Sequence, residues 1–174
     1  MSVFLQPIYT QTVSGSSTST ITFNSIPQTF TDLKILISVR NNSGSARNGL
    51  NYTFNGDTAT NYSNTILIGY DSSSVGSFRS SSQTASNESN MNGGGSTTNT
   101  FSNSEVYIPN YTGSNFKSII SDSTAENNSS SSYIIDMGAA LWRSTSAISS
   151  ISFTSGSGNF VANSTITIYG ITKG

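Results

Sequence analysis

The sequence predicts an all-β fold, namely an antiparallel two-sheet sandwich, jelly-roll-like, with about 8–10 strands. Three observations lead to this prediction. Apolar and polar residues alternate with a period of two along most of the chain, helical periodicity is almost absent, and clusters of Gly, Pro, Asn and Ser separate the alternating segments. The length of 174 residues suits a single domain, so we expect residues 1–174 to form one sandwich.

The clearest strand covers residues 32–40. Its apolar positions, which would face the core, are Leu33, Ile35, Ile37 and Val39. Its polar positions, which would face solvent, are Asp32, Lys34, Ser38 and Arg40. The same pattern predicts further strands at 19–23, 50–54, 65–70, 104–108, 116–120, 133–137, 148–153 and 165–171.

The run Phe54-Asn55-Gly56-Asp57 predicts a tight reversal, because Asn-Gly favours positive φ angles. Its oxygen atoms, together with those of Asn61, offer ligands to a hard cation such as calcium. The run lacks the acidic spacing of an EF-hand loop, so a hairpin turn is the favoured interpretation and no metal site is predicted.

Two segments depart from the strand pattern. Residues 71–100 are nearly all small and polar, with Val75, Phe78 and Met91 as the large apolar exceptions. We expect a long polar loop or a flexible hairpin here, because a connection of this length in a compact domain is usually functional or disordered. Residues 1–10 are more apolar and are expected to form an attachment arm.

Charge and composition limit the possible partners. Charged residues make up 9% of the chain, the net charge is -1, and the seven basic residues are scattered. A nucleic-acid partner is therefore not expected, because such binding needs clustered Lys and Arg. No apolar run approaches the roughly 20 residues that span a bilayer, so no membrane partner is expected. Uncharged hydroxyls and amides suit contact with other protein surfaces.

Little in the sequence supports catalysis. Histidine and cysteine are both missing, which removes the common nucleophilic triads and soft metal sites. Eight acids remain, and none forms a recognisable pair in the sequence. Glu88 lies in the polar segment and Glu105 on a predicted outer strand face, so a solvated or capping role is expected for both. We therefore predict that the protein is not an enzyme and has no catalytic residues and no cofactor.

Aromatic residues admit two interpretations. Tyr and Trp rings could form a platform for a glycan, but most of these residues lie in strand patterns that would fill the core. Trp142, the only tryptophan, precedes a predicted strand. We expect it to pack at one end of the sandwich.

Four stretches together resemble a family of small β-sandwich structural proteins of tailed bacteriophages, which includes capsid decoration (cement) proteins and tail fibre modules. They are residues 25–33 (SIPQTFTDL), 54–57 (FNGD) with 61–63 (NYS), 142–148 (WRSTSAI), and 158–160 (GNF) with 164–170 (STITIYG). The resemblance covers the first and last thirds of the chain and implies a virion protein.

The resemblance leads to two functional expectations. The first is a decoration protein on the outer surface of the phage head that binds the major capsid protein, or other virion proteins, and stabilises the capsid as a homo-oligomer, with a trimer favoured. Its expected partner-binding residues are Val3, Phe4, Leu5, Ile8 and Phe78, with the arm adding to a partner's sheet edge. The alternative is a tail fibre or receptor-binding module that recognises a cell-surface glycan through polar loops.

Overall fold

The computed structural model describes residues 4–71, 74–129 and 132–172. These residues form twelve β-strands, and none of the described segments is a helix. In consequence, the described part of the chain holds no helix that is long and apolar enough to cross a membrane. The strands are β1 (Phe4–Thr12), β2 (Thr20–Phe23), β3 (Asp32–Val39), β4 (Arg47–Phe54), β5 (Tyr62–Tyr70), β6 (Ser74–Gln83), β7 (Ser86–Asn92), β8 (Ser102–Ile108), β9 (Lys117–Thr124), β10 (Ile134–Trp142), β11 (Ile151–Ser155) and β12 (Thr165–Thr172).

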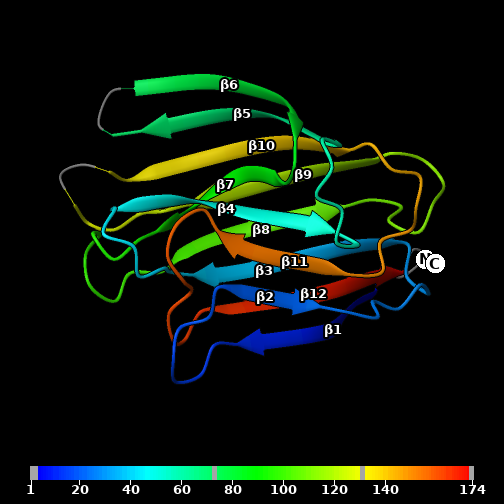
Figure 1. Ribbon diagram of the computed structural model, residues 1–174, viewed down its shortest axis with the longest axis horizontal. Coiled ribbons are helices and arrows are strands. Elements are labelled where there is room, and N and C mark those ends of the chain that lie inside the picture. Colours follow the sequence, from blue (N-terminus) through cyan, green and yellow to red (C-terminus); the bar gives the residue numbers. More distant parts are fainter. Residues whose placement is uncertain (1–3, 72–73, 130–131, 173–174) are drawn as a thin grey trace.

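The strands form two antiparallel sheets that pack face to face, as Figure 1 shows. The large sheet has the order β1-β12-β3-β8-β9-β10-β5-β6, and the small sheet has the order β2-β11-β4-β7. The chain passes back and forth between the sheets from β2 to β5, as in a jelly roll. The meander β8-β9-β10 lies between β3 and β5, while β1 and β12 extend the sheet beyond β3. The predicted antiparallel sandwich is confirmed, with more strands than expected.

The core lies between the sheets and follows the predicted alternation. The four apolar side chains of β3 are almost fully buried against the small sheet, and the described part of β12 adds Ile166 and Ile168 to the same layer. At one end, the indole of Trp142 packs on Phe54 and stacks on Tyr62, with ring centroids 5.3 and 6.5 Å apart. The prediction that Trp142 packs at an end of the sandwich is confirmed.

Residues 71–100 are not the long loop that their composition suggested. The described part of this segment, from Ser74 to Asn92, forms the edge strand β6 and then β7 in the small sheet. β6 is largely exposed, so it has little need of apolar residues. β7 buries polar side chains, including Ser86, Glu88 and Asn92, so it carries almost no apolar signal for the sequence pattern to detect.

The described part of the expected N-terminal arm, residues 4–10, belongs to the large sheet. β1 pairs with β12 from Phe4, opposite Thr172, to Thr12, opposite Thr165. Hydroxyl pairs reinforce this edge, with 2.9 Å between the Oγ1 atoms of Thr12 and Thr165. These residues form the edge strand of the sandwich instead of a free arm.

The Asn55-Gly56 turn has the predicted backbone, with φ angles of 53° and 68°. The amide of Asp57 donates to the carbonyl of Phe54 at 2.9 Å, which closes the reversal. The turn does not create a hairpin, however, because β4 and β5 belong to different sheets. It carries the chain across the end of the sandwich.

Asp32 and Arg40, two polar residues of the strand predicted at residues 32–40, are buried, although the alternation pattern placed them on the solvent face. The carboxylate of Asp32 accepts from the Tyr107 hydroxyl at 2.5 Å and from the amide of Asn110 at 2.9 Å. The guanidinium of Arg40 donates to carbonyls in the turn that follows β7, including Thr97 and Thr100, each at 2.9 Å. Both groups organise loops, which the alternation pattern of a strand cannot reveal.

Candidate functional site

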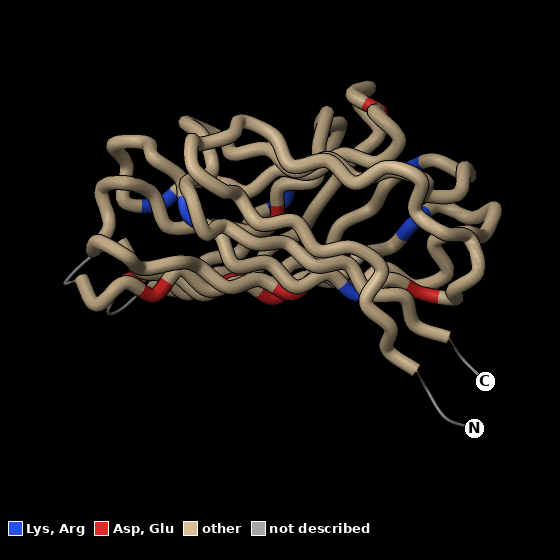
Figure 2. The backbone as a smooth tube through the Cα atoms, turned by 90° about the horizontal axis from the view of Figure 1, so that it is seen from below, with Lys and Arg blue, Asp and Glu red and all other residues tan. Residues whose placement is uncertain are grey.

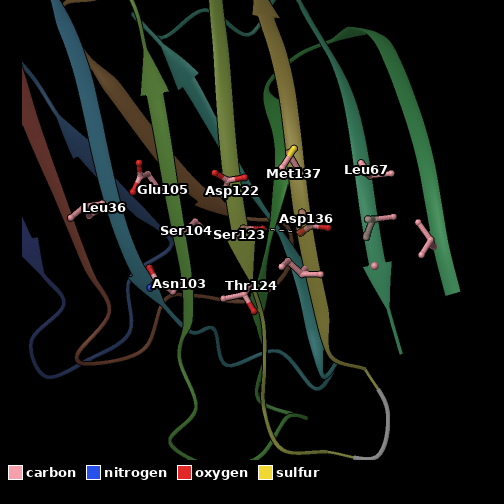
Figure 3. Close-up of a pocket in the computed structure, with 14 residues that line it drawn as sticks. Leu36, Leu67, Asn103, Ser104, Glu105, Asp122, Ser123, Thr124, Asp136 and Met137 are labelled. Carbon is pink, nitrogen blue, oxygen red and sulfur yellow. Dashed lines mark hydrogen bonds between the residues drawn. The ribbon is translucent and has the colours of Figure 1, made fainter. Parts of the chain in front are cut away.

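The outer face of the large sheet, which points away from the small sheet, carries a groove. The groove, of about 670 Å³, crosses strands β3, β8, β9, β10, β5 and β6 on this sheet. We call it the outer groove, and Figure 3 shows its lining side chains. Its lining residues are Leu36, Leu67, Ile68, Gly69, Val75, Asn103, Ser104, Glu105, Asp122, Ser123, Thr124, Ile135, Asp136 and Met137.

Strand register sets which side chains meet in the outer groove. Residues paired across an antiparallel sheet point to the same face. The pairings place six residues in one continuous row across the strands, and this central row is Thr167, Leu36, Glu105, Asp122, Met137 and Leu67. The neighbouring row contains Ser38, Asn103, Thr124, Ile135, Gly69 and Val75.

Large apolar side chains dominate the outer groove and remain open to solvent. Leu36 is 37% exposed, and Ile135 and Met137 are 65% and 61% exposed. Leu67 and Val75 are also exposed. Contiguous exposed apolar surface on a soluble domain typically marks an interaction site. This part of the sheet can therefore bury apolar area against a partner.

An acidic pair lies at the centre of the row. Glu105 on β8 and Asp122 on β9 are directly opposite each other in the register, and both side chains are exposed. Lys34 on β3 binds Glu105, with 2.7 Å between Nζ and Oε1. Figure 2 shows acidic positions along the layer of the large sheet. The expectation that Glu105 faces outward is confirmed, but the acids are not all dispersed as the sequence suggested.

Two neighbouring carboxyl groups raise the question of glycoside cleavage. That reaction uses carboxyl groups that flank the scissile bond, with one of them held as a proton donor. Glu105 and Asp122 stand side by side on one face of a sheet, and Lys34 neutralises part of their charge. Such an arrangement suits the recognition of a positively charged group better than general acid–base work.

The interior beneath β7 holds a second polar group of residues, which we call the polar layer: Glu88, Ser89, Asn90, Ser104, Ser121, Ser123 and Asp136. Glu88 was expected to have a solvated or capping role but is fully buried, and burial raises its pKa to about 8. Its carboxyl group accepts hydrogen bonds from the hydroxyls of Tyr52 and Ser86, the latter at 2.7 Å. Three residues of the polar layer, Ser104, Ser123 and Asp136, also border the outer groove.

Asp136 is the second acid of the polar layer. Burial raises its pKa, although hydrogen bonds from Asn90 and Ser123, at 2.9 and 2.8 Å, act in the opposite direction. Several buried polar atoms nearby have no hydrogen-bond partner in the described part of the chain, namely Asp136 Oδ1 and the Oγ atoms of Ser89, Ser104 and Ser121. Such atoms lower the stability of this half of the interior.

The residues predicted to bind a partner do not come together in the structure. Val3 lies outside the described residues. Phe4 and Leu5 are exposed on the edge strand β1, whereas Ile8 is half-buried against the core. Phe78 is 52% exposed on β6 but pairs with Ile66, so it faces the inner side of the sheet, opposite to the outer groove.

Sequence reasoning missed the outer groove, although a signal for it exists. Several strands contain adjacent apolar residues, which break the alternation of a half-buried strand. Examples are Leu36 between Ile35 and Ile37, and Leu67 between Ile66 and Ile68. Such doublets indicate that both faces of a sheet are apolar, and here the second face is exposed.

The Asn55-Gly56 turn was considered as a cation site, but in the structure the carboxylate of Asp57 accepts hydrogen bonds from neighbouring donors. Asp57 Oδ2 accepts from the indole Nε1 of Trp142 at 2.7 Å and from Asn61 Nδ2 at 3.0 Å, and its Oδ1 accepts from the amide of Ala59 at 2.9 Å. Desolvation acts to raise the pKa of Asp57, but these hydrogen bonds outweigh it and the pKa is lowered. Among the described residues, no group of three or more acids, His or Cys could hold a metal ion.

Comparison with known proteins does not indicate a function, so the outer groove is the main structural feature that bears on it. Neither a protein-family model nor a curated protein matches this chain.

Proposed function

We propose that this chain is a structural protein of a tailed-bacteriophage particle, specifically a capsid decoration protein, and that the outer face of its large sheet attaches it to the head. The observation that carries the proposal is the outer groove, where exposed Leu36, Ile135 and Met137 form an apolar surface on a rigid sheet. Attachment through this face would bury apolar area against the major capsid protein or another virion protein.

The composition of the chain supports a role as a binding component. The chain is rich in serine, threonine and asparagine, and charged residues make up only 9% of the sequence. Uncharged polar groups lose less free energy than charged groups when a neighbouring protein covers them. A trimer of this chain would multiply weak contacts by avidity. The proposal assigns no enzymatic activity to the chain.

The second expectation, a glycan-binding tail module, is less well supported by the outer groove. Sugar rings stack on Tyr and Trp faces, but none of the residues lining the outer groove is aromatic. Its aliphatic lining is better suited to a protein surface. We therefore keep the head-attached decoration protein as the proposed function.

The test is the location of the protein on intact particles. Particles carrying a tagged version of the chain are labelled and viewed by electron microscopy. Label over the whole head supports the decoration role. Label only at the tail end overturns it in favour of a tail module, and unlabelled particles that lack the chain refute a virion role.

A variant pair tests whether the outer face is the attachment surface. The double variant Ile135→Ser with Met137→Ser is expected to reduce occupancy on particles, because it removes apolar side chains from the outer groove. The control is Phe116→Ser, which changes a side chain of similar exposure (50%) outside the outer groove. Equal loss of occupancy in both variants would contradict attachment through this face.

A further inference from the structure

We propose that the outer groove binds an extended segment of a partner protein that carries one arginine or lysine, with apolar residues two positions before and two positions after it. This inference rests on the proposed function, because it names the partner chemistry of the same face. Its three supports are the charge at the centre of the groove, the spacing of the strands, and the absence of a matching segment in this chain.

The charge at the centre is unbalanced. Glu105 and Asp122 stand directly opposite each other on adjacent strands, an arrangement that destabilises a sheet when the charges are alike. Lys34 binds Glu105 through its ammonium group. In the part of the chain that the structure describes, no ion pair involves Asp122. One negative charge therefore remains in the middle of an apolar surface, and a single cation from a partner would balance it.

The spacing of the strands fits an extended chain that runs across them. Neighbouring strands lie about 4.8 Å apart, so the midpoint of the acidic pair is roughly 7 Å from Leu36 on one side and from Met137 on the other. Alternate side chains of an extended segment are about 6.6 Å apart. A cation over the acidic pair would thus place apolar side chains on Leu36 and Met137. Figure 3 shows these four side chains in one line across four strands.

A second copy of this chain does not provide that segment. Among the Lys and Arg residues from Lys34 to Arg143, none has large apolar residues at both the position two before and the position two after it. Three of them fail on one side only, because a polar residue lies two positions before Lys34, two positions before Lys117 and two positions after Arg143. Face-to-face pairing of two outer grooves would also bring two acidic pairs together. The occupant is therefore a different protein.

The experiment uses three synthetic peptides as probes of the isotopically labelled full-length chain by NMR. The peptides are acetylated and amidated forms of Gly-Leu-Ser-X-Ser-Leu-Gly, in which X is arginine, glutamine or glutamate. The arginine peptide is expected to bind at millimolar concentration and to shift amide signals of β8, β9 and β10. The glutamine peptide should bind about fivefold more weakly, and the glutamate peptide should not bind.

Charge variants then test whether Asp122 binds the arginine side chain of the peptide. Asp122→Asn is expected to lower the affinity for the arginine peptide about fivefold and to leave the affinity for the glutamine peptide unchanged. The control Glu126→Gln removes the same charge just beyond the end of β9 and should change neither affinity. The spectra of the free variants report directly whether each one is folded.

The outcomes separate this inference from the proposed function. Equal binding of the three peptides, shifts outside the outer groove, or no binding of the arginine peptide at millimolar concentration would overturn the cation proposal. The cation proposal can fail while the Ile135→Ser and Met137→Ser double variant still loses occupancy on particles. In that case the outer face remains the proposed attachment surface, without the cation. If occupancy is also unchanged, both proposals fail.

Discussion

The interior of the sandwich has two halves that are built differently. Beneath β2, β11 and β4, the large sheet presents aliphatic side chains such as Ile35, Ile37 and Ile168, which are almost fully buried. Beneath β7 lies the polar layer, with two buried acids, Glu88 on β7 of the small sheet and Asp136 on β10 of the large sheet. Apolar burial stabilises the first half whatever the pH, whereas the second half depends on the protonation of its carboxyl groups. The two halves of one sandwich therefore differ in how their stability responds to pH.

The largest expected effect comes from placing a charge in the apolar half. Ile37→Asp should unfold the domain, at a cost of roughly 4 kcal/mol or more, because an unpaired carboxylate would enter the core. Its neighbour Leu36 points to the outer face, so Leu36→Asp should stay folded. Circular dichroism and urea unfolding of the two variants measure the difference. Two variants of equal stability would show that the assigned faces are wrong.

The polar layer should make stability depend on pH. Burial raises the pKa of Glu88 from 4.5 to about 8, so between these pH values the folded state holds a proton that the unfolded state has lost. The free energy of unfolding should therefore fall as the pH rises from about 4.5 to about 8, by at most about 1.4 kcal/mol per pH unit for one proton. The raised pKa of Asp136 acts in the same direction.

Glu88→Gln tests the origin of this dependence. The amide cannot ionise, so the variant should lose most of the slope and should be more stable than the parent at pH 8. Urea unfolding at several pH values between 5 and 8 provides the measurement. A parent protein that gains stability over this range, or a variant with an unchanged slope, would contradict the burial of Glu88 in its neutral form.

A smaller effect is expected from packing between the sheets. Gly138 on β10 faces the polar layer, and a Cβ atom at this position would lie 2.7 Å from Cβ and Cγ of Glu88. Gly138→Ala should therefore destabilise the protein by about 1–3 kcal/mol. The matched control is Gly69→Ala on the outer face, where the new Cβ would lie 3.2 Å from Ile135 Cγ2. Thermal unfolding should show the larger loss for Gly138→Ala.

The smallest expected effect concerns the outer face, which has its own electrostatic imbalance. Asp122→Asn removes the repulsion between Asp122 and Glu105 and should stabilise the domain by a few tenths of a kcal/mol, about the scale of a cross-strand pair. The gain should shrink at high salt, because exposed charges are screened. Chemical unfolding at low and high salt measures it. A destabilised variant would indicate that Asp122 has a stabilising role within the sheet.

The sequence by itself determined the fold class and the apolar half of the core. Nine predicted strands correspond to β2–β5 and β8–β12, because alternation reports directly on a sheet with one buried face. β1, β6 and β7 escaped this pattern. β1 and β6 are largely exposed edge strands, and β7 buries polar residues, so in none of the three does hydrophobicity separate the two faces.

Only the tertiary structure decided the outer groove and the polar layer. Glu105 and Asp122 lie on consecutive strands and become direct neighbours through the register in which β8 pairs with β9. Glu88 is buried because β7 joins the small sheet and faces β10, where Gly138 leaves room for its side chain. Strand order and register fix both contacts, and they arise from long-range pairing that local residue patterns do not encode.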